Sequence, residues 1–189
     1  METQGTLFGQ MDTAPPSGFR YLEDLLTPEE EFAFAASLAR LDLKPFEFHG
    51  HIGNRRVANF GLQYDYDRQT VESAQEMPIF LVDLLTRAAR FGGCEPGLIR
   101  QVGVNEYRPG AGIGWHVDRP QFGIVIGVSL LAPGIMRFRR AQQAGWQRFT
   151  KSIAPRSIYL LSGEIRREWQ HSIPPADELR YSINFRTLA

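Results

Sequence analysis

The chain has 189 residues, 43% of them hydrophobic and 22% charged, and its 21 basic and 21 acidic side chains cancel at neutral pH. This composition is typical of one soluble globular domain, excludes a disordered or fibrous chain, and argues against strong nonspecific binding to nucleic acid. No apolar run approaches the roughly 20 residues of a membrane helix, which excludes a membrane-spanning segment.

Residues 1–18 are rich in Gly, Pro, Ser and Thr and show almost no apolar periodicity, so we expect a flexible N-terminal tail. Within this tail, Gln4-Gly5-Thr6-Leu7-Phe8 resembles the short peptide with which bacterial proteins dock on the replication sliding clamp. A Leu-Phe pair near a terminus can equally well cover the domain, because five-residue motifs match easily by chance.

Two helices are expected in the first half of the chain. The first is predicted to begin at Thr27-Pro28, where Thr27 can cap the helix and Glu30 completes a capping box, and to end before Pro45. Its apolar residues at helical spacing are Phe32, Ala35, Ala36, Leu38 and Ala39. The second is predicted from about Pro78 to Phe91 and is ended by Gly92-Gly93. Its expected inward residues are Ile79, Phe80, Val82, Leu84, Leu85 and Ala88.

The remaining segments predict strands. Residues 46–68 are expected to form an irregular or hairpin insertion between the two helices. From about Arg100 onward, short β-type runs are separated by Gly, Pro or polar residues, at 101–107, 122–131, 135–139, 148–153, 157–161 and 181–186. Strands without helical patterns between them predict an antiparallel sandwich or jelly roll, and therefore an α+β fold with the helices included.

The single Cys94 excludes an internal disulfide framework, and the N-terminus lacks the basic and apolar blocks of a signal peptide. We therefore expect a cytoplasmic monomer without membrane contacts. The charge is unevenly distributed, with a net −7 in residues 1–96 and +7 in residues 97–189. A C-terminal half rich in arginine could face an anion or a nucleic acid, although a GC-rich genome also favours arginine codons.

Two of the four histidines occur in a pattern that suggests metal binding. His116 and Asp118 are two residues apart at the expected end of a strand, so their side chains project from the same face. His171 follows in a second β-like run. Two histidines and one carboxylate on a β-scaffold form the facial triad of non-haem Fe(II) oxygenases. A surface histidine near an aspartate is the alternative for His116 and Asp118 taken alone.

The C-terminal strand supplies two arginines, Arg180 and Arg186, whose even spacing places them on one face. Arginines that point into a barrel require an anion, and a dicarboxylate is a natural partner for a guanidinium; a solvated edge strand is the alternative. Asn105 and Tyr107 also share one face and offer polar groups inside an apolar barrel. Alternatively, Asn105 belongs to the turn before Pro109-Gly110 and Tyr107 is an ordinary core residue.

Taken together, Asn105-x-Tyr107-x-Pro109-Gly110, His116-x-Asp118, His171 and Arg180-(five residues)-Arg186 resemble the AlkB family of Fe(II)/2-oxoglutarate dioxygenases over about residues 45–188. The resemblance implies a double-stranded β-helix core with N-terminal helices packed on one sheet, a single domain over residues 19–189, and Fe(II), 2-oxoglutarate and O2 as cofactors. It assigns the iron to His116, Asp118 and His171. It also implies that Arg180 pairs with the distal carboxylate of 2-oxoglutarate, that Arg186 helps to bind it near the metal, and that Asn105 and Tyr107 hydrogen-bond it.

Two positions depart from the family pattern. Ser182 stands where some relatives have Asn, so one hydrogen bond to the co-substrate is expected to be weaker or water-mediated. Pro120 stands where the best-known bacterial member has an acidic side chain that touches the substrate base. The base preference of that member therefore does not carry over to this chain.

The resemblance also implies that residues 46–68 form a substrate-recognition lid. The segment combines basic and aromatic side chains, the chemistry that stacks on bases and holds phosphates: His49, His51, Arg55, Arg56, Phe60, Tyr64 and Tyr66. We expect substrate contacts from Arg55, Arg56, Phe60 and Tyr64. An ordinary hairpin with exposed arginines and core aromatic residues is the alternative.

The function that follows is oxidative demethylation of N-alkylated nucleic-acid bases, as in the repair of DNA or RNA alkylation damage. Since a paired base cannot reach a buried iron, the expected partner is an alkylated single strand or a flipped-out nucleotide. The same core could instead demethylate or hydroxylate a protein side chain, or modify a tRNA base. A binding module without catalysis would leave the metal-ligand pattern and the inward arginines unexplained.

Overall fold

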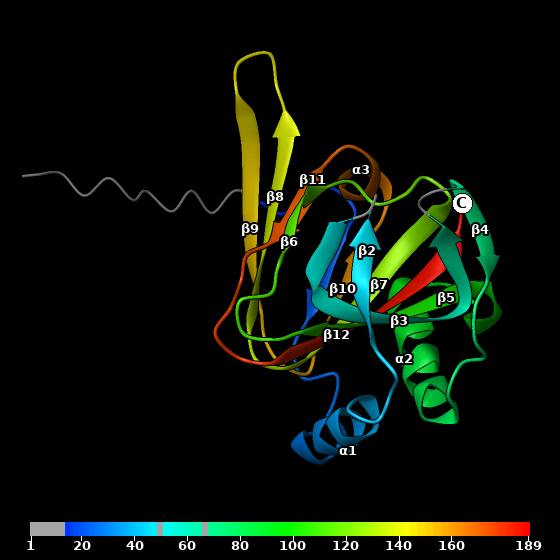
Figure 1. The fold of residues 1–189 in the computed structure, drawn as a ribbon. Coiled ribbons are helices and arrows are strands. Elements are labelled where there is room, and N and C mark those ends of the chain that lie inside the picture. Colours follow the sequence, from blue (N-terminus) through cyan, green and yellow to red (C-terminus); the bar gives the residue numbers. More distant parts are fainter. Residues whose placement is uncertain (1–13, 49–50, 66–67) are drawn as a thin grey trace, which may run out of the picture.

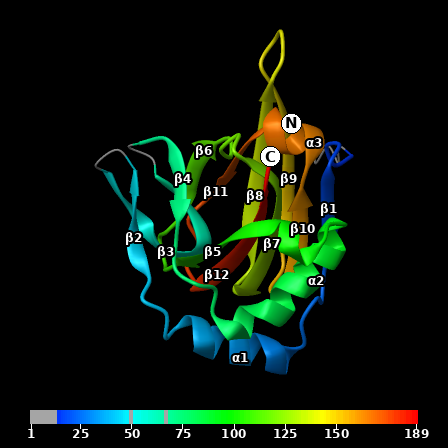
Figure 2. The same cartoon turned by 90° about the vertical axis from the view of Figure 1, so that its right-hand side faces the viewer.

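The computed structural model of the chain describes residues 14–48, 51–65 and 68–189. Its strands form two sheets, and two helices cover the outer side of the larger sheet (Figures 1 and 2). The larger sheet has the order β1-β10-β7-β12-β5-β3-β2, with β4 paired to β3, and the smaller sheet has the order β6-β11-β8-β9. In the described part of the chain, no helix is both long and apolar enough to cross a membrane.

The strands of the larger sheet are β1 (Phe19–Leu22), β2 (Lys44–Phe48), β3 (His51–Asp65), β4 (Thr70–Ser73), β5 (Ile99–Tyr107), β7 (Phe122–Leu131), β10 (Ser157–Leu161) and β12 (Arg180–Leu188). Those of the smaller sheet are β6 (Ile113–His116), β8 (Gly134–Ala141), β9 (Trp146–Ile153) and β11 (Gln170–Ile173). From β5 onward the chain passes back and forth between two antiparallel sheets, which confirms the double-stranded β-helix, or jelly roll.

The helices are α1 (Pro28–Leu38), α2 (Val82–Gly92) and the short α3 (Gly163–Arg167), with 3-10 turns η1 (Ile79–Leu81) and η2 (Pro96–Leu98). The capping box of α1 is confirmed. The Thr27 amide donates to the Glu30 carboxylate at 2.9 Å, and the Glu30 amide donates to Thr27 Oγ1 at 3.2 Å. Gly93 ends α2 with φ 71°, a left-handed conformation that suits glycine.

The expected inward faces of the helices are only partly correct. Leu84, Leu85 and Ala88 are buried, but Ile79 and Val82 are 85% and 41% exposed. The reason is η1: a tighter turn precedes α2, so a helical period counted from Ile79 is out of phase with the helix that follows. Phe32 of α1, also expected to face inward, is 78% exposed.

Two hydrophobic cores hold the layers together. The first lies between the helices and the larger sheet, where Leu38 and Leu84 pack with sheet residues such as Val104 and Phe185. The second lies between the two sheets and includes Met136, Phe138, Trp169 and other buried residues of both. The candidate site lies in this second layer, between the two sheets, so the polar groups of the site are surrounded by packed side chains on both sides.

Residues 46–68 contain a hairpin, one of the two forms expected for this segment, and are also part of the larger sheet. β2 and β3 form a hairpin, and β3 continues into the larger sheet by pairing with β5 from Arg56 to Gly61. The segment that was expected to act as a lid is therefore anchored in the sheet that carries the site.

The N-terminal segment is described from residue 14 onward. Its end is hydrogen-bonded to the loop and helix after β10, because Ser17 O and Gly18 O accept from Ile165 N and Ser162 N at 3.1 and 3.0 Å. The clamp-like peptide Gln4–Phe8 and residues His49 and Tyr66 lie outside the described residues, and so does the side chain of His51.

Candidate active site

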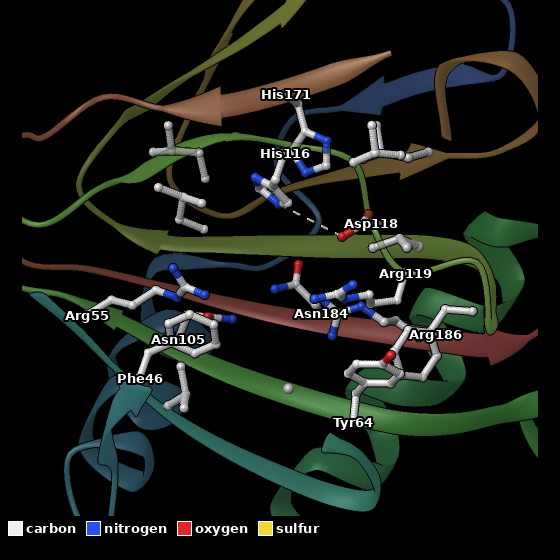
Figure 3. A pocket seen from close by; sticks show the side chains of 18 of the residues that line it. Phe46, Arg55, Tyr64, Asn105, His116, Asp118, Arg119, His171, Asn184 and Arg186 are labelled. Carbon is white, nitrogen blue, oxygen red and sulfur yellow. Dashed lines mark ion pairs between the residues drawn. The ribbon is translucent and has the colours of Figure 1, made fainter. Parts of the chain in front are cut away.

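Three candidate metal ligands meet between the two sheets (Figure 3). His116 ends β6, Asp118 follows two residues later, and His171 lies opposite His116 on β11. Their ligand atoms all lie within 4.8 Å of one another, and His116 Nε2 is 4.0 Å from Asp118 Oδ1. His116 Nδ1 lies 2.9 Å from the carbonyl oxygen of Gly114, which leaves Nε2 as the nitrogen available to a metal.

The protonation states of these groups suit a metal. Burial lowers the pKa of His171 to about 4, so its imidazole is neutral at neutral pH, the form that binds metals. Burial alone would raise the pKa of the Asp118 carboxyl. Nearby His171, Arg186, His116 and Arg166 outweigh burial and hold that pKa below its ordinary value. Asp118 is therefore an anion beside neutral His171, a donor set that fits a divalent iron.

Arg166 of α3 holds the loop that carries Asp118. It is 4% exposed, and its guanidinium donates to the carbonyl oxygens of Asp118 at 3.2 Å, of Phe122 at 2.7 Å and of Arg119. Its Nε also lies 3.9 Å from Asp118 Oδ2. One buried side chain thus joins both ends of the loop 118–122 and adds positive charge behind the carboxylate.

One face of β12 carries Arg180, Ser182, Asn184 and Arg186, and of these Asn184 and Arg186 line the pocket. β12 lies between β5 and β7, so its side chains share a face with the residues directly opposite on those two strands. Ser182, for example, is opposite both Asn105 and Ser129. The even spacing of the two arginines thus places them on one side of a central strand, as the sequence predicted.

Arg180 is 2% exposed, and its Nε donates to Ser129 Oγ at 2.9 Å. Its two terminal nitrogens are buried and have no hydrogen-bond partner within residues 14–48, 51–65 and 68–189. The guanidinium lies 5.1 Å from the ring centroid of Tyr107. A buried guanidinium that leaves two donors unpaired is costly unless an anion meets it, and the paired donors match a carboxylate.

Several polar groups line the pocket together with the metal ligands. Asn105 and Tyr107 both line the pocket, in agreement with their predicted common face. Tyr159 donates its hydroxyl to Asn184 Oδ1 at 3.2 Å, and burial raises the pKa of this tyrosine, so the hydroxyl remains protonated. Arg186 donates to Gln101 Oε1 at 2.9 Å and also lines the pocket.

The pocket has a volume of about 490 Å³, within the range of small-molecule sites. At its mouth, two arginines lie over aromatic rings. Arg55 is 3.6 Å from the ring centroid of Phe46, and Arg119 is 5.0 Å from that of Tyr64. Figure 3 shows these two pairs at opposite ends of the pocket, with the metal ligands on the far side of Asn184.

Two residues that were expected to contact substrate lie elsewhere. Arg56 forms an ion pair with Glu106 at 3.2 Å and donates to the carbonyl oxygen of Leu43 at 2.7 Å. Phe60 is 3% exposed and belongs to the core on the helix side. The cause is alternation along β3, which places Arg55 on the pocket side and both Arg56 and Phe60 on the opposite side.

Tyr64 reaches the pocket although its position has the same parity as Arg56. Between them, Gly61 has φ 76°, and a Cβ there would lie 2.5 Å from the carbonyl oxygen of Arg100. This glycine interrupts the alternation, and beyond it β3 pairs with β4. The sequence shows the glycine but not the change of side that it causes.

Comparison with known proteins agrees with this geometry. The sequence model of the 2OG-Fe(II) oxygenase superfamily matches residues 18–186. An alkylated DNA repair protein ALKBH8 homolog from Arabidopsis thaliana is 30% identical over 181 residues, and a mitochondrial alpha-ketoglutarate-dependent dioxygenase alkB homolog 7 from Bos taurus is 31% identical over 125 residues. The chain belongs to the AlkB family of the 2OG-Fe(II) oxygenase superfamily. It is thus a dioxygenase that uses Fe(II), 2-oxoglutarate and O2, and its donor set fits that iron.

Coverage differs among these AlkB relatives. The Arabidopsis match covers 83% of this chain and 51% of the relative, and the bovine match covers 59% and 54%. A tRNA (carboxymethyluridine(34)-5-O)-methyltransferase alkbh8 from Xenopus tropicalis is 30% identical over 179 residues, with 85% of this chain but 26% of that protein covered. The chain therefore spans between a quarter and about half of the length of these relatives.

Solved structures confirm the jelly-roll fold of this AlkB-family chain. The structure of OsALKBH1 aligns with a TM-score of 0.67 at 12% identity, and covers 93% of this chain and 99% of that one. A Pseudomonas putida prolyl-4-hydroxylase aligns with a TM-score of 0.60 at 17% identity, with 91% and 93% covered. At such low identity the likeness concerns the fold alone.

Sequence reasoning missed several residues of the site. Asn184 has the same parity as Arg180 and Arg186, so alternation along β12 could have found it. Ser129 and Tyr159 come from β7 and β10, and only the strand order brings them next to β12. Nothing in the local sequence marks these two residues.

Proposed function

We propose that this AlkB-family dioxygenase oxidises an N-alkyl group on a nucleic-acid base and thereby removes it. The observation that carries the proposal is the pocket itself, which contains the candidate metal ligands, has two arginine–aromatic pairs at its mouth, and is lined by Asn184 and Arg186 from the face of β12 that also carries Arg180. Bound Fe(II) supplies the redox chemistry, in which 2-oxoglutarate and O2 become succinate and CO2 while one oxygen atom is inserted into a C–H bond of the substrate. The resulting N-hydroxymethyl group then leaves as formaldehyde, and the base regains its N–H.

In this proposal the position of each residue determines whether it binds the metal or the co-substrate. His116 and His171 of the smaller sheet and Asp118 of the loop after β6 hold Fe(II). Arg180 holds the distal carboxylate of 2-oxoglutarate, because its two buried terminal nitrogens have no partner in the described part of the chain and it shares the face of β12 that carries Asn184 and Arg186. Arg186, whose positive charge is near Asp118, helps to hold the end of the co-substrate that lies at the metal.

The same proposal gives the polar groups between these ends an orienting role. Asn105, Tyr107 and Ser182 offer hydrogen bonds along the co-substrate, and Asn184 is already engaged by Tyr159. With the co-substrate held at both ends, the remaining space opens toward the mouth, where a base can enter.

Arg55 and Tyr64 of the expected substrate residues remain in the proposal, joined by Phe46 and Arg119. Planar arginine–aromatic pairs suit a flat base and its anionic backbone, since guanidinium groups contact both aromatic faces and phosphates. A duplex base cannot enter a pocket at this depth, so the substrate is single-stranded or flipped out.

A tRNA base is the second candidate substrate. It is favoured by the 30% identity over 179 residues to the Xenopus protein that is named as a tRNA methyltransferase. The catalytic site assigned above is the same in both cases, so the two proposals differ only in which nucleic acid and which group on its base is oxidised.

One experiment separates these substrates. The purified protein is incubated with Fe(II), ascorbate and 2-oxoglutarate and with N-methylated oligonucleotides, tRNA or methylated peptides, and the products are analysed by mass spectrometry. Loss of one methyl group with formaldehyde release from the oligonucleotide supports the first proposal. A gain of one oxygen atom on a tRNA base supports the second. Turnover of peptides alone would contradict both.

Arg55 and Arg56 form a matched pair for testing the pocket mouth. Arg55→Gln is expected to weaken binding of a methylated single strand about fivefold at 0.1 M salt, the size of one phosphate contact, and to flatten the salt dependence by about 0.7. Arg56→Gln removes the same charge but breaks the ion pair with Glu106, so it is expected to lower the unfolding temperature and leave the salt dependence unchanged. Fluorescence anisotropy over a salt series measures the first effect. Equal slopes for both variants would remove Arg55 from the substrate site.

Arg166 is expected to act as a positioning residue for the metal site. Arg166→Gln releases the loop that carries Asp118 and is expected to weaken metal binding about 10- to 100-fold, as loss of outer partners of metal ligands does. Calorimetric titration with Fe(II) under anaerobic conditions measures this affinity. Arg167→Gln, at the exposed neighbouring position of α3, is the control and should bind metal as the unchanged protein does. An unchanged affinity in Arg166→Gln would show that the loop is held by other contacts.

A further inference from the structure

The outer face of the smaller sheet carries a row of arginine and tryptophan side chains that the proposed function leaves unused. Phe138 of β8 is 1% exposed and faces the inner core, so its neighbours Arg137 and Arg139 point outward. The Arg139 guanidinium lies 4.3 Å from the ring centroid of Trp115 and also 4.3 Å from that of Trp146. Arg137 lies 5.5 Å from the Trp115 ring. These four residues are called the Arg–Trp row below.

The row connects the pocket to a projecting part of the molecule. Trp115 directly precedes the candidate ligand His116 and is one of the residues that line the pocket. Trp146 begins β9 in the β8–β9 hairpin, which extends beyond the rest of the molecule in both views (Figures 1 and 2). A strand whose base enters the pocket could therefore continue along this face.

The strands of the smaller sheet carry no acidic side chain. They contain four arginines and one lysine but no Asp or Glu, and of these basic residues Arg137 and Arg139 point outward beside the indole rings. Within the described ranges, no carboxylate lies within 4.0 Å of Arg137 or Arg139, whereas Arg140 is paired with Glu164 at 2.8 Å and Glu168 at 3.1 Å. Arg137 and Arg139 thus lack the acidic partners that neutralise their neighbour.

The stacked arrangement determines which part of a ligand can bind. The Arg139 guanidinium contacts two indole rings, each at 4.3 Å, and its Nε donates to Gln170 Oε1 at 2.7 Å. The remaining N–H groups point along the guanidinium plane, where they can donate to an anion. Since the rings are already stacked on guanidinium groups, the row offers donors to phosphates rather than free aromatic faces to bases.

We infer that the Arg–Trp row binds the sugar-phosphate backbone of the nucleic-acid strand whose base occupies the pocket. This inference rests on the proposed function for its ligand, and it adds a second contact region on the smaller sheet. Two aligned arginines favour a polyanion over a single small anion, because each phosphate contact contributes separately to binding.

The test uses the full chain and a fluorescein-labelled 20-nucleotide single strand with one N-methylated base. Binding is measured by anisotropy from 0.05 to 0.5 M KCl for the unchanged protein, for Arg137→Gln/Arg139→Gln and for Arg40→Gln/Arg90→Gln. Arg40 and Arg90 are exposed at the C-terminal ends of α1 and α2, so the control removes the same charge from the helix side. Loss of two phosphate contacts is expected to reduce the salt slope by about 1.4 and the affinity at 0.1 M about 25-fold, with the control unchanged.

The outcomes separate this inference from the proposed function. An unchanged slope in Arg137→Gln/Arg139→Gln overturns the inference, and equal changes in both double variants reduce it to an effect of net charge and overturn it as well. Product formation on the same oligonucleotide is measured in parallel by mass spectrometry. Demethylation with an unchanged slope supports the proposed function alone, whereas a reduced slope without demethylation supports the binding face and contradicts the proposed reaction.

Discussion

Asp118→Ala is expected to abolish turnover and to lower Fe(II) affinity more than about 100-fold. The change removes the only carboxylate of the three-residue donor set and leaves two imidazoles. Changes to outer partners of metal ligands already cost 10- to 100-fold, and loss of a direct ligand should exceed them. Metal binding also stabilises the folded state by mass action, so the unchanged protein should show a rise in unfolding temperature with added Fe(II) that the variant lacks.

The metal-dependent shift in unfolding temperature distinguishes a lost ligand from a damaged fold. Asp177→Ala, at an exposed position in the loop before β12, is the control and should keep both turnover and the shift. The metal-free Asp118→Ala protein should still unfold cooperatively, because Arg166 retains its bonds to the loop carbonyl groups. Full activity of Asp118→Ala at limiting Fe(II) would contradict the assignment of the metal site.

The success of sequence reasoning at this site has a simple physical basis. Side chains alternate along a strand, so the spacing of six places Arg180 and Arg186 on one face of β12. The spacing of two at His116 and Asp118 has a different basis, because β6 ends at His116 and Asp118 lies in the loop that Arg166 holds. The structure adds that β12 is a central strand of the larger sheet, with its polar face toward the pocket. Buried arginines on a central strand have few explanations other than an anionic ligand.

The substrate residues expected within 46–68 were only partly correct, because no regular strand was predicted there and alternation was not applied. Arg55 and Arg56 look equivalent as neighbours in the sequence, but the pairing of β3 with β5 sends them to opposite faces. Gly61 then shifts the alternation, so Tyr64 rejoins the pocket side and Phe60 remains in the core. A bulge position depends on which strands pair, and that information lies in distant parts of the chain.

Sequence patterns also could not identify the residues that contact the site from other elements, because their positions depend on how distant parts of the chain pack together. Ser129 binds Arg180, and Arg166 holds the loop of Asp118, although neither belongs to a recognisable motif. Their sequence separations of 51 and 48 residues are closed only by the jelly-roll topology. The motif therefore predicts the groups that contact metal and co-substrate, while the residues that position those groups emerge from the fold.

Arg180→Ala is expected to raise KM for 2-oxoglutarate about 10- to 150-fold, with a much smaller change in KM for the alkylated substrate. Hydrogen bonds to charged groups contribute about 1.5–3 kcal/mol, and the variant removes both terminal donors of a buried guanidinium. Arg180→Lys keeps the charge but loses the paired donors, so its KM for 2-oxoglutarate should lie between those of the unchanged protein and Arg180→Ala. Equal increases in both KM values would indicate a structural role for Arg180.

A double cycle shows whether Arg180 meets the distal carboxylate itself. 2-Oxobutyrate lacks that carboxylate, so the unchanged protein should use it far less well than 2-oxoglutarate. If the guanidinium and the carboxylate are partners, Arg180→Ala should discriminate little between the two acids. The substitution and the replacement of 2-oxoglutarate by 2-oxobutyrate each remove the same interaction. The ratio of kcat/KM for the two acids, measured by decarboxylation, gives the coupling. A ratio that is equally large in Arg180→Ala would mean that the carboxylate is held elsewhere, with Arg186 the next candidate on the same face of β12.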